Sequence, residues 1–183
     1  MIVLIILIVL IVIIGLVAVS MYNGLVKQKN RVESAWAQID VQLKRRYDLI
    51  PNLVETVKGY ATHEKETLEA VIAARNAGVS AQGPAQQAEA ENVLSGALRQ
   101  LFALSEAYPD LKANQNFLAL QEELSATEGR VAYARQFYND SVLEYNNKLQ
   151  QFPTVFYARM LHFEPREYFE TDEAAREVPT VEF

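Results

Sequence analysis

The chain has 183 residues, a formal net charge of −6, no cysteine, 7 glycines and 6 prolines. This composition excludes a general nucleic-acid binder, which needs a basic surface, and a disulfide-stapled scaffold. The length suffices for one domain with its own core, and the scarcity of glycine and proline predicts few long loops.

The first 21 residues, MIVLIILIVLIVIIGLVAVSM, contain no charged side chain. As a helix they would span roughly 31 Å, about the hydrocarbon thickness of a bilayer. Backbone groups in lipid must be satisfied within the segment, so residues 1–21 are predicted to be a transmembrane anchor. A signal peptide cleaved near residues 18–20 is the alternative, and the length of the run favours the anchor. We expect Ile2, Leu10, Gly15 and Val19 to lie within the membrane anchor, and Tyr22 to lie at the level of the lipid headgroups.

Basic residues follow the anchor at Lys27, Lys29 and Arg31, whereas none precedes it. The positive-inside rule therefore predicts that the N-terminus lies outside and that the remaining chain lies in the cytoplasm. The opposite orientation, with the folded part outside, is the alternative.

The helical period continues directly from the anchor, with apolar residues three and four apart. We expect this first helix to reach about Tyr47 and to be interrupted at Pro51, which lacks a backbone donor. Proline suits the first turn of a helix, so a second helix is expected from Pro51 to Gly78, which would stop it. A kinked continuation through Pro51 is the alternative. Residues 79–83 are expected to form the next loop.

Pro84 is expected to open a third helix, with Glu91 among its early acidic residues, as the helix dipole favours. Pro109 would close that helix, and a fourth would run from residues 114–116 to about Gln150. Four amphipathic helices with short connections predict an all-α fold, an antiparallel four-helix bundle continuous with the anchor.

The bundle is assigned to residues 22–163 and an acidic C-terminal tail to residues 164–183. The apolar patch at residues 154–163 is expected to pack back on the bundle, and the last ten or so residues are expected to be loose.

The run AWAQIDVQLKRRYDLIPNLVETVKGYATHEKETLEAVIAARNA, which begins at Ala35, resembles the signature of the LemA family. The later run YARQFYNDSVLEYNNKLQQFP and the N-terminal apolar stretch fit the same family, so the resemblance covers essentially the whole chain. It implies a bacterial membrane protein with an N-terminal anchor and an all-α, antiparallel four-helix domain. We further expect coiled-coil packing of the helices and a location in the bacterial inner membrane. It supplies no reaction and no catalytic residue. The family is itself similar to a group of magnetosome membrane proteins.

Two polar groups are candidate interaction sites. The first is the cluster of Lys44, Arg45, Arg46 and Asp48, read either as a docking site for an acidic partner or headgroup, or as a solvated helix end. The second is His63 with Glu64, which begins like a zinc-protease helix but lacks the second histidine. Trp36 lies on the apolar stripe, and a core position is expected rather than a ligand-stacking one.

No catalytic, metal or cofactor site is predicted. The favoured hypothesis is a membrane-anchored scaffold that contacts the bilayer, forms a homo-oligomer, docks membrane or envelope proteins and binds no nucleic acid. A sensor hinged at Pro51, with a ligand-sized cavity, is the second hypothesis. An enzyme that acts near the membrane through an unrecognised site is the third.

Overall fold

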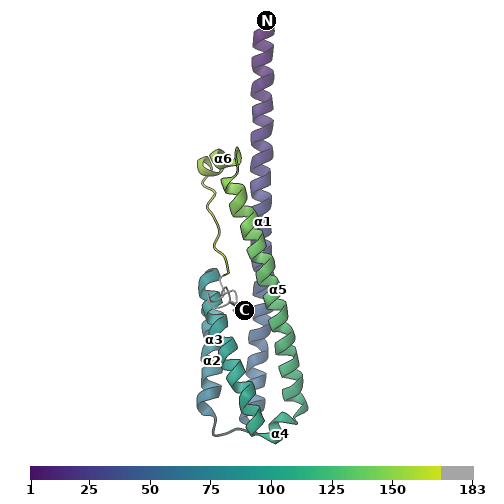
Figure 1. Cartoon of the computed structure of the whole chain (residues 1–183), viewed down its shortest axis with the longest axis vertical. Helices are drawn as coiled ribbons and strands as arrows, with labels where there is room; N and C mark the ends of the chain where they lie inside the picture. Colours follow the sequence, from purple (N-terminus) through teal and green to yellow (C-terminus); the bar gives the residue numbers. More distant parts are fainter. Residues whose placement is uncertain (170–183) are drawn as a thin grey trace, which may run out of the picture. The chain divides into compact units, whose positions relative to one another are not determined.

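The computed structural model describes residues 1–169 of the chain, and its regular elements there are all helical (Figure 1). This confirms the predicted all-α fold. The helices are α1 (Ile2–Lys58), α2 (Lys65–Ser80), α3 (Gly83–Leu104), the 3-10 helix η1 (Ser105–Ala107), α4 (Pro109–Lys112), α5 (Gln115–Gln150) and α6 (Thr154–Met160). The chain forms two compact units. Unit 1 contains Met1–Gln38 and Gln136–Glu167, and unit 2 contains Ile39–Arg135 with residues 168–169.

In unit 1, residues 24–36 of α1 pack against the C-terminal part of α5. The rings of Trp36 and Tyr138 meet edge to face with centroids 5.4 Å apart, and further along α1 the Arg31 Nη1 atom lies 2.5 Å from Glu144 Oε2. Lys148 approaches Gly24 as well, so residues 36, 31 and 24 of α1 face residues 138, 144 and 148 of α5, and falling numbers on one helix meet rising numbers on the other. The two segments are therefore antiparallel, as predicted. Trp36 is half-buried, against the core position expected for it.

The beginning of α1 has no partner within the described residues. Each large apolar side chain in residues 2–17 is at least 45% exposed, and the most apolar window has a mean hydropathy of 3.8 with none of it buried. In Figure 1 this stretch continues beyond the end of α5, within unit 1. Its length and composition are those of a membrane-spanning helix.

Unit 2 is built mainly from residues 39–58 of α1, the whole of α2 and α3, and residues 115–135 of α5, and it also contains the short helices η1 and α4. Helices α2 and α3 lie side by side and are joined by only two residues, 81 and 82 (Figure 1). Apolar residues spaced three or four apart on each helix fill the core, as the sequence period predicted. They include Ile39, Leu43, Ile50, Leu53, Val57, Leu68, Val71, Leu94, Leu98, Leu101, Phe117, Leu124 and Val131.

The predicted break at Pro51 is wrong, because α1 continues through this residue to Lys58. The turn that separates α1 from α2 lies at residues 59–64 instead, directly after the glycine at position 59. The predicted second helix from Pro51 to Gly78 is therefore two pieces: the last turns of α1 and the separate helix α2. The alternative, continuation through Pro51, agrees with the structure.

Three further boundaries differ from the predictions. Helix α2 passes Gly78 and ends at Ser80, and α3 begins at Gly83, so the expected loop at residues 79–83 is reduced to residues 81 and 82. Helix α3 begins at Gly83, whose φ of 80° suits glycine, and ends at Leu104, after which a 3-10 turn leads into the short helix that Pro109 opens. The fourth predicted helix, α5, has its expected bounds.

The apolar patch at residues 154–163 packs back on α1 and α5 only in part: the Phe163 ring contacts the Tyr22 ring, but other apolar side chains of the patch stay exposed. Part of it forms α6, whose Thr154 and Ala158 are buried, whereas Phe156 and Met160 are 64% and 66% exposed. Seven residues form only two turns, and the two buried positions one turn apart leave the opposite face uncovered. The loose end predicted for the acidic tail lies outside the described residues.

Candidate interaction site

A buried ion pair joins α1 to α3 within unit 2. Arg46 and Glu91 are 3% and 2% exposed, and the Arg46 Nη1 atom lies 2.6 Å from Glu91 Oε2. Arg46 Nη2 also donates to Ser95 Oγ at 2.9 Å. Burial of either charge alone would be costly, so each side chain makes the other tolerable in this core.

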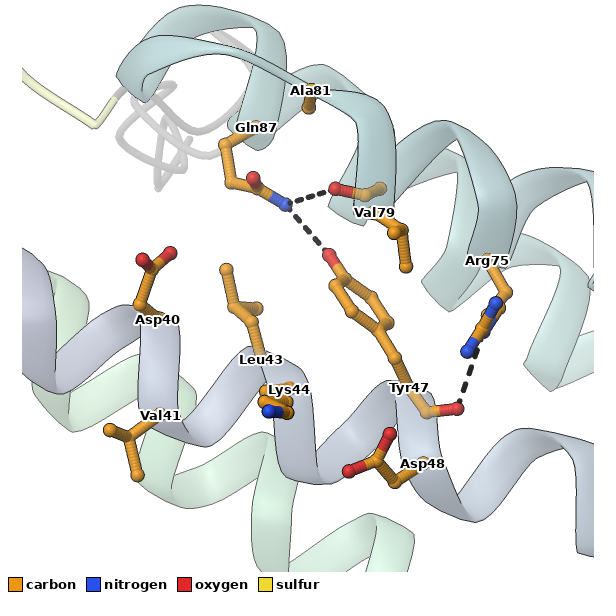
Figure 2. Close-up of a pocket in the computed structure, with 11 residues that line it drawn as sticks. Asp40, Val41, Leu43, Lys44, Tyr47, Asp48, Arg75, Val79, Ala81 and Gln87 are labelled. Atoms are coloured by element: carbon orange, nitrogen blue, oxygen red, sulfur yellow. Dashed lines mark hydrogen bonds between the residues drawn. The ribbon is translucent and has the colours of Figure 1, made fainter.

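Tyr47, the next residue on α1, extends the network across the bundle. Its hydroxyl donates to Glu91 Oε1. It also accepts from Gln87 Nε2 at 2.7 Å, and the same Gln87 nitrogen donates to the Gly78 carbonyl at 3.3 Å; Figure 2 shows these two bonds of Gln87. Burial, and then the hydrogen bond and charge of Glu91, raise the pKa of Tyr47 above its ordinary value. The side chain is therefore a neutral phenol that joins α1, α2 and α3.

Gly78 is placed on α2 to admit this tyrosine. A Cβ atom at Gly78 would lie 2.5 Å from the Tyr47 hydroxyl and 2.8 Å from the ring carbon that carries it. No side chain fits in that space without displacing the ring. The glycine that was predicted to stop the helix instead serves a close contact inside it.

Arg75 of α2 explains how α1 tolerates Pro51. Proline has no N–H, so the carbonyl of Tyr47, four residues earlier, loses its usual helical donor. Arg75 Nε supplies a donor to this carbonyl from the neighbouring helix, at 3.4 Å (Figure 2). The tertiary contact thus partly replaces the missing backbone hydrogen bond.

Several of these residues line a cleft of about 590 Å³ between α1 and the α2–α3 hairpin (Figure 2). Charged side chains of both signs line it, with Asp40, Lys44 and Asp48 on α1 and Arg75 on α2. Val41, Leu43, Tyr47, Gly78, Val79, Ala81 and Gln87 form the rest of its lining. This chemistry can hold a small polar group or a side chain of a partner helix.

The structure divides the basic cluster that the sequence predicted. Lys44 and Asp48 line the cleft, whereas Arg45 forms an exposed pair with Glu123 of α5 at 2.7 Å and Arg46 is buried. The helix does not end there, so the interpretation of these cations as a solvated helix end is wrong.

The other predicted pair lies elsewhere in unit 2. His63 is exposed in the turn between α1 and α2, and Glu64 accepts a hydrogen bond of 3.1 Å from the Tyr108 hydroxyl. Within residues 1–169, no group of three His, Cys, Asp or Glu side chains gathers in a way that could hold a metal ion.

The sequence interpretation missed Glu91, Gln87 and Arg75 as members of the site. The helix dipole accounts for Glu91 as an early acidic residue, yet Glu91 lies three residues before Leu94 on the apolar stripe of α3. A charge on an apolar stripe predicts a buried partner, and this signal was available. Gln87 and Arg75 carry no comparable signal, because their partners are identified only by the packing.

These observations define a class of protein, the all-helical proteins in which one long N-terminal helix carries an apolar, membrane-length stretch and a bundle segment. The LemA family model matches residues 35–183, and the chain belongs to the LemA family.

Named relatives agree with this assignment. Protein LemA of Metamycoplasma hominis is 28% identical over 164 residues, which cover 87% of this chain and 74% of the relative. Magnetosome protein MamQ 2 of Paramagnetospirillum magneticum is 24% identical over 186 residues, covering 87% and 68% of the two chains. Magnetosome protein MamQ of Magnetospirillum gryphiswaldense is 25% identical over 174 residues, covering 81% and 64%.

Proposed function

We propose that this protein is a single-pass, membrane-anchored interaction protein that self-associates or docks partner proteins at a bacterial inner membrane and carries no chemistry of its own. The observation that carries the proposal is the first part of α1. Its apolar side chains are exposed over a membrane length, and the same helix continues into packed structure without a linker. Such an exposed apolar helix is stable in the hydrocarbon core of a bilayer.

The polar interior supports binding rather than catalysis. Arg46 and Glu91 neutralise each other, and Tyr47 is held as a neutral phenol by burial and by Glu91. A general acid or base works best when its pKa lies near the operating pH. The pKa of Tyr47, raised by burial and by the neighbouring carboxylate, lies far above neutral pH. The network thus serves to fix three helices, and it leaves exposed helix faces for partners. The names of the MamQ relatives place those proteins in the magnetosome, which agrees with a role in organising a membrane.

Cross-linking in native membranes tests the proposal. Full-length protein at native levels is expected to give cross-linked homo-oligomers or defined adducts with membrane proteins after treatment with a short lysine-reactive reagent. Deletion of residues 2–21 should release the protein from the membrane and reduce these products, because the anchor concentrates copies in two dimensions. A full-length protein that stays monomeric and without adducts would contradict the proposal.

The cleft favours a second function, that of a ligand-responsive bundle. Its volume is that of a small-molecule site, and α1 and α2 line opposite sides of it. Spin labels on the variants V41C and V79C, both at exposed lining positions, report the distance across it. A ligand from a filtered cell extract should change that distance distribution. An unchanged narrow distribution would exclude this function.

A further inference from the structure

We propose that α6 and its flanking residues form a second membrane contact, in which the exposed face of α6 lies in the headgroup region of the bilayer. The proposal rests on the proposed membrane anchoring and names a further surface that meets the lipid. All residues that carry it belong to unit 1, so their arrangement is that of one compact body.

The exposed face of α6 is apolar and continuous. Phe152, Phe156 and Met160 follow one another at intervals of four residues and are 80%, 64% and 66% exposed, and Leu161 beside them is 43% exposed. The rings of Phe152 and Phe156 pack edge to face, with centroids 5.9 Å apart. Phe156 and Met160, four residues apart within α6, lie on one helix face, away from the buried Thr154, and the ring contact brings Phe152, which precedes the helix, beside Phe156.

This face lies at the level where the apolar stretch of α1 ends. The ring of Phe163, just after α6, meets the ring of Tyr22 edge to face at 6.1 Å, and Tyr22 follows the anchor directly. A Cβ at Gly24, half a turn further, would lie 3.1 Å from Lys148 Nζ near the end of α5. Helix α6 therefore lies beside α1 at the end of the anchor (Figure 1), so a bilayer that covers the anchor reaches the level of the exposed face of α6.

Hydrogen bonds hold the segment that follows α6 against α5. Asn146 accepts from the Arg166 backbone N–H and donates to the Arg166 carbonyl, both at 2.9 Å. The Tyr145 hydroxyl donates to the Glu164 carbonyl at 3.1 Å. Helix α6 is thus fixed to α5 at both ends, by the chain that precedes it and by these hydrogen bonds after it. Its apolar face is therefore held in an exposed position.

Charge and composition favour lipid over a second protein as the occupant. Arg159 is the exposed charged residue of α6, and Lys148 and Lys27 lie near the same level on α5 and α1. Cations beside exposed aromatic and apolar side chains are typical of helices that lie in an interface and meet lipid phosphates.

The depth of a spin label tests the proposal in full-length protein. The chain has no cysteine, so single variants F156C and M160C can be labelled cleanly. Both side chains are exposed, so the fold should tolerate them. The protein is reconstituted in vesicles of equal parts phosphatidylethanolamine and phosphatidylglycerol, and collision with oxygen and with a nickel chelate gives the depth. Labels at 156 and 160 are expected about 5–10 Å below the phosphates.

Two variants on α1 calibrate the measurement. L10C reports the anchor and should be deeper than position 156, and A37C, 15 residues beyond Tyr22 on α1, should be fully open to the nickel chelate. If position 10 is deep but position 156 matches position 37, the proposal is overturned and the anchor stands. If position 156 is shielded from both reagents, a protein surface covers it, and the proposal is again overturned. If position 10 is also open to nickel, the membrane anchoring itself fails.

Discussion

At the scale of single residues, the Arg46–Glu91 pair is the most demanding feature of unit 2, because both charges are almost fully buried. Glu91→Ala should destabilise the protein by about 3–5 kcal/mol, since it leaves the Arg46 charge unpaired. Denaturant unfolding of the full-length protein in detergent, followed by far-UV circular dichroism, measures this effect.

The neighbouring pair Arg45–Glu123 provides a matched control, because its side chains are 51% and 41% exposed. Glu123→Ala should cost less than about 1 kcal/mol. Replacement of both buried charges, with Arg46→Met and Glu91→Leu, should restore most of the loss. Equal effects of the two single alanine variants would show that the burial of Arg46 and Glu91 is unimportant.

Gly78 makes a steric prediction. Gly78→Ala places a methyl group against the Tyr47 hydroxyl and should destabilise the protein by about 1–3 kcal/mol, as overpacking does. Gly96→Ala is the control, because the space around Gly96 on α3 is open and alanine favours a helix by up to about 1 kcal/mol. The two variants should shift the midpoint of thermal unfolding in opposite directions. A stabilising Gly78→Ala would refute the close contact.

Tyr47 predicts a dependence on alkaline pH. Its pKa is raised in the folded protein by burial and by Glu91, so deprotonation favours the unfolded chain. This contribution to stability is complete below the unfolded pKa of about 10 and is lost as pH rises above it. The variant Tyr47→Phe should therefore be less stable than the wild type at neutral pH. As the pH rises above about 10, its free energy of unfolding should fall less than that of the wild type.

Denaturant midpoints measured from neutral to alkaline pH test this difference in slope. Tyr133→Phe removes an exposed tyrosine and controls for the number of tyrosines. Parallel profiles for Tyr47→Phe and the wild type would contradict the assignment.

At the scale of the elements, α1 depends on Arg75 at the point where Pro51 interrupts its hydrogen bonding. Arg75→Ala should cost about 1 kcal/mol in the wild type, because the Tyr47 carbonyl loses its donor. In a Pro51→Ala background that carbonyl regains a backbone N–H, so Arg75→Ala should cost little. A double-mutant cycle in denaturant gives the coupling between the two sites, and a coupling of zero would refute the compensation.

The sequence predicts which segments are helical better than it predicts where they end. The apolar period of three and four residues identifies α5 and the core of α1. Pro51 misled the prediction because the proline rule is local, whereas the compensating Arg75 lies on another helix. The real boundary carries a weaker signal, the glycine at position 59 just after Lys58.

The same distinction applies to the site. Arg46 and Glu91 each lie beside apolar core positions on their helices, so their burial could be predicted from spacing. That they pair with each other could not, because pairing depends on how α1 and α3 are placed. Gly78 shows most clearly what the sequence cannot predict, because a glycine can either end a helix or make space for a neighbouring aromatic ring.

At the scale of the whole molecule, the orientation in the membrane is a testable expectation. Lys27, Lys29 and Arg31 follow the apolar stretch, so the folded part should face the cytoplasm. A cysteine at the exposed Gln82, introduced as Gln82→Cys, should resist an impermeant thiol reagent in intact cells and react after lysis. Labelling in intact cells would place the folded part outside.

The direct passage of α1 from exposed apolar turns into packed structure has a mechanical meaning. A glycine- and serine-rich tether would let a folded body drift tens of ångströms from its attachment point, whereas a continuous helix allows almost no slack. Unit 1 must therefore follow every tilt of its lipid-facing end. A change in bilayer thickness that leans the helix would lean the attached body with it.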